Sequence, residues 1–187
     1  MNRLDGHEKA LFCYDKSLEL DSEEVNIWNN RGVTLEVLGR FNDALESYDE
    51  ALKLDSKHSS AWFNKGKLFS KMSRFEEALE SYDKAVELDS SDADNWFDKG
   101  FTLAKIGRYE EALLCYDEAL ELDPRHVAVW FNKGKILCYL KRFEESLNCF
   151  DKVISVFPED GLAWTYKGHV LTRMGKFEEA LKCFDKL

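Results

Sequence analysis

Residues 59–92 have the sequence SSAWFNKGKLFSKMSRFEEALESYDKAVELDSSD, which contains two apolar stripes. Within each stripe the apolar residues recur at intervals of three and four, the spacing of an amphipathic helix. The polar break Met72-Ser73-Arg74 separates the two stripes. The stretch shows no strand-like alternation, so we expect two antiparallel helices joined by a tight turn.

The same pattern repeats along the chain of 187 residues. Its five tryptophans follow one another at intervals of 34 residues, and a fixed period of this kind indicates a stack of repeats. We therefore expect a single domain, 1–187, made of a half-repeat, four full repeats and a truncated repeat. Their bounds are 1–24, then 25–58, 59–92, 93–126 and 127–160, and finally 161–187.

A glycine stands four residues after each tryptophan. Glycine inside a helix costs about 1 kcal/mol relative to alanine, so its recurrence implies a packing requirement. We expect a large aromatic side chain of the second helix, such as Tyr82, to cross close to the backbone there. The glycines are Gly32, Gly66, Gly100, Gly134 and Gly168.

The motif Trp-x-x-x-Gly, followed by Phe, Ala, Tyr and Ala and then Pro or Ser, resembles the tetratricopeptide repeat family over essentially the whole chain. The resemblance implies an all-α fold, a right-handed superhelical solenoid of stacked antiparallel helix pairs. We expect a lone helix at about 7–20 and then five pairs. In one column, where the family usually has Leu, this chain has Arg31, Lys65, Lys99, Lys133 and Lys167.

An aspartate column accompanies that basic column, because an Asp directly follows each member of one aromatic column of the second helices, namely Tyr48, Tyr82, Tyr116, Phe150 and Phe184. In an antiparallel pair, Lys65 and Asp83 lie at a similar level. They are either two solvated charges or one rung of a ladder of ion pairs between helices. Exposed pairs contribute only about 0–1 kcal/mol each.

The charge balance narrows the classes of partner. Lys and Arg number 26 and Asp and Glu number 36, which gives a formal net charge of −10. This balance argues against binding a nucleic-acid backbone or an anionic lipid surface. No apolar run approaches the roughly 20 residues of a membrane span, and the first residues lack a signal-peptide core. We expect no nucleic-acid partner and no membrane partner.

The five cysteines form no C-x-x-C pair, which favours reduced thiols and a cytoplasmic location. Four of them share a column with Ser47 and Ser81, so the column indicates a need for a small side chain. Redox sensing is the less favoured alternative. The four are Cys13, Cys115, Cys149 and Cys183.

No arrangement of residues indicates catalysis. None of the four histidines stands four residues from another His or Cys, so a metal site is not expected. Glycine patterns for nucleotide binding are missing, and the recurring Glu pairs suit helix starts. We predict no catalytic residue, no metal and no cofactor, and hence a protein that is not an enzyme.

The resemblance implies that the first helices line the concave side, where members of the family bind peptides and partner proteins. The residues that flank the Trp-Gly stripe combine aromatics, amides and lysines, which suits recognition. The alternative is that Phe63, Phe97 and Phe131 pack sideways between repeats. The predicted groove consists of Asn29, Asn30, Phe63, Asn64, Lys67, Lys71, Phe97, Asp98, Phe101, Lys105, Phe131, Asn132, Lys135, Tyr139, Tyr166, His169 and Arg173.

Some family members hold a C-terminal carboxylate with Lys, Asn and Arg on successive first helices. The corresponding positions here carry residues such as Phe63 and Phe97, so we do not predict an adaptor for chaperone tails. We predict a non-catalytic scaffold that binds a protein or peptide. The alternative is an arm or fragment of a larger enzyme or multi-subunit complex.

The ends of the repeat array carry a further expectation. Each repeat buries its face only against its neighbours, so an end without a cap exposes apolar surface. At the C-terminal end we expect Val170, Leu171, Met174, Leu181 and Phe184 to lack cover. Self-association through such ends is therefore possible.

Overall fold

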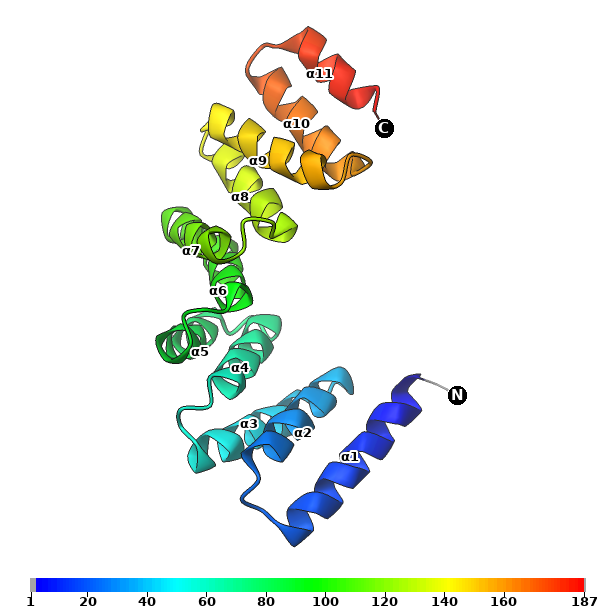
Figure 1. Cartoon of the computed structure of the whole chain (residues 1–187), viewed down its shortest axis with the longest axis vertical. Helices are drawn as coiled ribbons and strands as arrows, with labels where there is room; N and C mark the ends of the chain where they lie inside the picture. The colour runs from blue at the N-terminus through cyan, green and yellow to red at the C-terminus, as the bar shows by residue number, and fades with distance from the viewer. Residues whose placement is uncertain (1–2, 187) are drawn as a thin grey trace. The chain divides into compact units, whose positions relative to one another are not determined.

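The computed structural model describes the backbone of residues 3–186 and the side chains of residues 5–186. Met1, Asn2 and Leu187, which fall in the predicted half-repeat and truncated repeat, lie outside the described residues. All regular secondary structure from residue 3 to residue 186 is α-helical (Figure 1). The helices are α1 (Arg3–Leu20), α2 (Val25–Val37), α3 (Phe41–Leu54), α4 (Ser59–Lys71), α5 (Phe75–Leu88), α6 (Ala93–Lys105), α7 (Tyr109–Leu122), α8 (Val127–Tyr139), α9 (Phe143–Val156), α10 (Gly161–Arg173) and α11 (Phe177–Phe184).

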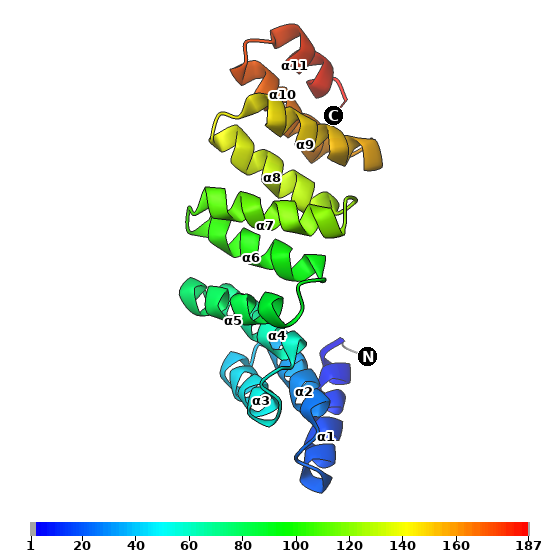
Figure 2. The same cartoon turned by 60° about the vertical axis from the view of Figure 1, so that its left-hand side comes forward.

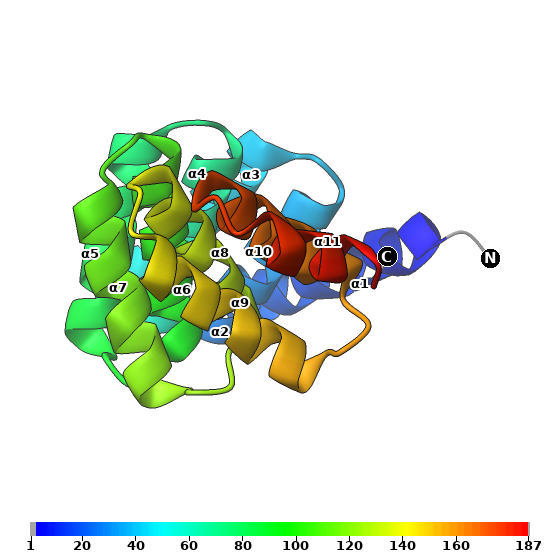
Figure 3. The same ribbon diagram turned by 90° about the horizontal axis from the view of Figure 1, so that it is seen from above.

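The chain forms two compact units, residues 1–102 and 103–187. In the first unit α2 pairs with α3 and α4 with α5, while α1 packs on α2 (Figure 1). In the second unit α8 pairs with α9 and α10 with α11, while α7 packs on α8 (Figures 2 and 3). The predicted stack of helix pairs is confirmed within each unit, and the single-domain organisation stays a prediction.

Each helix pair turns on one residue with a left-handed backbone. Gly39, Gly107 and Gly175 have φ angles of 76°, 80° and 78°, and Ser73 and Lys141 take the same position with φ of 61°. The next residue donates its N–H to a carbonyl five residues back, as Arg74 does to Phe69 at 2.9 Å. This is the Schellman closure of a helix end, and it reverses the chain at each predicted polar break.

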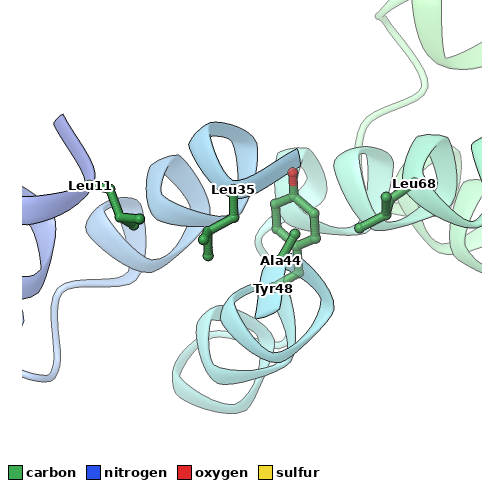
Figure 4. Packing of buried hydrophobic residues seen from close by; sticks show 5 residues of the cluster. All are labelled: Leu11, Leu35, Ala44, Tyr48 and Leu68. Atoms are coloured by element: carbon green, nitrogen blue, oxygen red, sulfur yellow. The ribbon is translucent and has the colours of Figure 1, made fainter. Parts of the chain in front are cut away.

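The core of each repeat is an aromatic ring against a glycine. A Cβ placed on Gly32 would lie 2.5 Å from Cε1 of Tyr48, which is fully buried (Figure 4). The same construction places a Cβ on Gly66 at 2.9 Å from Tyr82. The close approach predicted for the glycine column is therefore confirmed.

The cluster around Tyr48 shows how neighbouring repeats share one core. Its buried members come from four successive helices, α1 to α4 (Figure 4). A side chain of one repeat thus excludes water from the next, which is how a repeat stack gains stability. The members are Leu11, Leu35, Ala44, Tyr48 and Leu68.

The basic column does form ion pairs, but with a partner that the sequence analysis did not predict. Lys65 binds Asp49 at 2.5 Å and not Asp83, while Asp83 binds Lys99 at 2.7 Å. Each cation therefore contacts the second helix of the preceding repeat and not its own partner helix. The other pairs are Arg31–Asp15, Lys133–Asp117 and Lys167–Asp151.

The expectation for the C-terminal end was partly wrong. Val170 and Leu171 are 0% and 3% exposed, because Leu171 packs in a cluster with Ala180 and Cys183 of α11. Leu181 is 62% exposed, as expected, and Phe177 is 68% exposed. The apolar surface at this end thus belongs to α11.

Candidate functional site

The first helices of successive repeats lie side by side within each unit. In the first unit, Nδ2 of Asn64 on α4 donates to Oδ1 of Asn29 on α2 at 3.0 Å. One end of the same two helices is joined by the ion pair Lys71–Glu36 at 3.3 Å. Since both contacts link residues 35 positions apart, the rows inferred from the repeat alignment are real neighbours in space.

Asn29 departs from the predicted groove, because it is only 8% exposed. Its carboxamide holds Asn64 in place instead of meeting solvent. The neighbouring Asn30 is exposed. The sequence pattern could not separate these two positions. Only the packing of α2 against its neighbours decides which of two adjacent residues on the helix is buried.

The phenylalanine row both packs and remains accessible. Phe63 lies against Tyr82 with ring centroids 6.0 Å apart, and it is half-buried. The Lys67 Nζ lies 5.2 Å from the centroid of the Phe63 ring. Phe63 thus packs within its own repeat, 59–92, and keeps exposed surface, whereas Phe131 packs on the next repeat through Tyr166.

The α6 helix completes the candidate surface of the first unit. Phe97 and Phe101 are half-buried, with ring centroids 6.0 Å apart. Asp98 is near Tyr82, and its charge adds to burial, the larger cause, in raising the pKa of the Tyr82 hydroxyl. Lys105, at the end of α6, is exposed and belongs to the second unit.

In the second unit α8 and α10 form one strip, which we call the α8–α10 strip. Phe131 and Tyr166 meet edge to face at 5.2 Å, and Nη1 of Arg173 donates to the Cys138 carbonyl at 3.1 Å. The strip is defined by Phe131, Lys135 and Cys138 on α8 and by Tyr166, His169 and Arg173 on α10. These positions recur at helical spacing, so each set shares one helix face.

The other predicted residues on α8 lie beside this strip. Tyr139 is 65% exposed and packs against Tyr109 with ring centroids 4.8 Å apart. Asn132 is half-buried, and its Nδ2 donates to the Ala128 carbonyl at 2.9 Å. One of the two side-chain N–H groups of Asn132 is therefore already engaged by its own helix.

Sequence reasoning missed Leu162, which is 65% exposed near the start of α10. A signal was present in its column, where the other repeats carry Asn26, Ser60, Asp94 and Ala128. A large apolar residue in a column of polar or small residues indicates that the surface becomes more apolar at that repeat. Leu162 therefore adds exposed apolar area at the start of α10.

The thiols follow the packing interpretation. Cys115, Cys149 and Cys183 are buried, whereas Cys13 is exposed. Burial raises the pKa of the Cys149 thiol to about 11 and also raises the pKa of Cys183. A buried thiol with a raised pKa is a weak nucleophile, which disfavours a redox role for this column.

No group of three or more His, Cys, Asp or Glu side chains among the described residues could hold a metal ion. None of the described helices is both long and apolar enough to span a membrane.

Comparison with known families gives the assignment. Models described as tetratricopeptide repeat match residues 25–58, 59–92, 93–126, 127–160 and 163–187. The chain belongs to the tetratricopeptide repeat family. Proteins of this family mediate protein and peptide binding, and the matched repeats leave no catalytic domain within residues 25–187.

Several solved tetratricopeptide repeat structures are similar to this chain. A crystal structure of MamA protein aligns with a TM-score of 0.83 at 23% identity, covering 88% of this chain and 90% of that one. MamA from Desulfovibrio magneticus RS-1 gives 0.80 at 18% identity, with coverages of 87% and 92%. YrrB, described as a TPR protein with an unusual peptide-binding site, gives 0.81 at 25% identity, with coverages of 92% and 89%. A search of curated protein sequences returned no match.

Proposed function

We propose that this tetratricopeptide repeat protein is a non-catalytic scaffold that binds a protein or peptide on the surface of its first helices. One observation carries the proposal: apart from Asn29, every residue of the predicted groove retains exposed surface. Aromatic side chains that are held in place yet accessible contribute contact area at a low entropic cost. The peptide-binding site named for YrrB supports the same use of the fold.

The amides and the rings have separate roles in this proposal. Asn30 is exposed. Asn64 donates one N–H to Asn29, which leaves the side-chain carbonyl oxygen of Asn64 for a ligand. An amide can accept from and donate to a peptide backbone, whatever the peptide sequence. A ring in each unit, Phe63 in the first and Phe131 in the second, then contacts side chains of the ligand bound to that unit, which provides selectivity.

A second candidate is an arm that recruits partners within a larger enzyme or complex. The exposed Phe177 and Leu181 of α11 favour it, because they offer apolar surface outside the first helices. The location that we propose is cytoplasmic, in keeping with five free cysteines. Purification of the full assembly from its source, followed by mass spectrometry, tests whether the chain is such an arm of a larger complex.

The main proposal is tested by selecting peptides from a random phage-displayed library. We expect the wild-type protein to enrich a family of peptides and a variant changed on both units, with Asn30→Ala and Lys67→Ala in the first and Tyr166→Ala and His169→Ala in the second, to bind them at least tenfold more weakly. A matched control, Glu80→Ala with Lys84→Ala on the exposed side of α5, should bind them normally. If the wild-type protein enriches no peptide, or if both variants bind equally, the proposed surface is wrong.

A further inference from the structure

The α8–α10 strip carries positive charge that the protein itself does not neutralise. All four Lys, Arg, Asp or Glu residues of α8 and α10 are basic: Lys133, Lys135, Lys167 and Arg173. Lys133 and Lys167 are paired with Asp117 and Asp151 of the preceding second helices. The charge that remains is that of Lys135 and Arg173.

Neither remaining cation meets a carboxylate among the described residues. Lys135 Nζ lies 5.9 Å from the ring centroids of both Phe131 and Tyr166. Arg173 lies over the Phe143 ring at 5.1 Å and donates from Nη1 to the Cys138 carbonyl. Rings and a carbonyl position these side chains without cancelling their charge, so Lys135 and the other N–H groups of Arg173 remain available as donors.

The first unit repeats only part of this arrangement, because Lys67 lies 5.2 Å from the Phe63 ring centroid but acidic residues stand among its first-helix residues. There Lys71 is paired with Glu36, and Asp98 occupies the row of Asn64 and Asn132. Its first-helix surface therefore has mixed charge, whereas the α8–α10 strip is positive in a protein of formal net charge −10. Such a positive strip attracts anionic groups of a ligand to this part of the surface.

We propose that the α8–α10 strip binds an acidic segment of the partner, in which Asp or Glu side chains flank an aromatic or aliphatic residue. The carboxylates accept from Lys135 and Arg173, and the apolar side chain contacts Tyr166 and Phe131. This inference rests on the proposed function and names the chemical class of its ligand.

The ligand groups are carboxylates of side chains and not of the chain terminus. Asn132 is the only amide side chain in the sequences of α8 and α10, and one of its two N–H groups is bound to the Ala128 carbonyl. A terminal carboxylate lies beside backbone groups that need amide partners, and Asn132 is the one amide side chain that α8 and α10 offer. Amidation of the peptide should therefore leave binding unchanged.

The test uses the phage-displayed library described above with the full chain. We expect peptides selected by the wild-type protein to be rich in Asp and Glu. Lys135→Glu with Arg173→Glu should reverse the preference toward basic peptides and weaken the wild-type peptides roughly tenfold or more. Lys152→Glu with Lys182→Glu changes net charge equally on exposed sites of α9 and α11 and should leave the selection unaltered.

The outcomes separate this inference from the function on which it rests. Selected peptides that lack acids, or a preference that both charge reversals alter equally, would overturn the acidic ligand while peptide binding stands. A library that yields no peptide overturns both proposals. If the reversed variant unfolds, Lys135→Met with Arg173→Met keeps the apolar stems on the rings, and undiminished binding of a synthetic, amidated acidic peptide would then refute the inference.

Discussion

Gly66 is the position where a single methyl group should be felt most directly. A Cβ there would meet the Tyr82 ring at 2.9 Å and the Ala78 carbonyl oxygen at 3.2 Å. We expect Gly66→Ala to lower the free energy of unfolding by about 1–3 kcal/mol, despite the better helix propensity of alanine. Urea denaturation followed by circular dichroism measures it.

Gly6 provides the matched control for this substitution. It lies inside α1, and a Cβ would meet nothing within 4 Å. Gly6→Ala should therefore leave stability unchanged or raise it by up to about 1 kcal/mol. Equal effects of the two substitutions would show that the close approach of Tyr82 is not what selects glycine.

The cysteines should differ in their reactivity with pH. At neutral pH a thiol reagent should modify the exposed Cys13 quickly and Cys149 slowly, because burial raises the pKa of Cys149 to about 11. The folded state favours the protonated Cys149 thiol. The stability that this thiol contributes is therefore complete below about pH 8.5 and is lost as pH rises toward 11. Mass spectrometry of alkylated peptides across this pH range follows both thiols. Equal labelling rates at pH 7 would contradict the assignment.

The turns within the helix pairs depend on one residue each. Ser73 has a φ of 61°, in the left-handed region where the equivalent Gly39 and Gly107 lie. Side chains with a Cβ are strained there, and relief of that strain exceeds the entropy that glycine costs. We expect Ser73→Gly to stabilise the protein by about 0.5–1 kcal/mol, measured as an upward shift of the melting temperature. Gly39→Ala should shift it downward, and a shift in the same direction for both would refute this explanation.

Periodicity was sufficient to predict the helix pairs, whereas the candidate surface built from it stays a prediction. It failed where the answer depends on stacking between repeats, as for the partner of Lys65, which is Asp49 and not Asp83. It also could not show that Asn29 is buried while Asn30 is exposed. Each repeat has the same local pattern, so the pattern predicts the helix pair. The partner of Lys65 and the burial of Asn29 depend instead on contacts between repeats.

The exposed apolar face of α11 has a consequence for the protein in solution. Phe177 and Leu181 are 68% and 62% exposed, while the equivalent Phe41 and Leu45 are partly buried in clusters shared with the next repeat. We expect association of chains that grows with concentration and is reduced by Phe177→Glu with Leu181→Glu. Sedimentation velocity measures it, with Leu20→Glu, at an exposed leucine of α1, as the control. A 21.8 kDa monomer at every concentration would contradict the expectation.

The ion pairs between repeats make every junction chemically alike. Each repeat presents a cation to the repeat before it and an aspartate to the repeat after it, as Lys65 and Asp83 do for residues 59–92. Excision of that stretch would bring Lys99 to Asp49 and restore the same pair. A gain or loss of a whole repeat by gene duplication or deletion would therefore preserve this ion pair at the new junction without a compensating mutation.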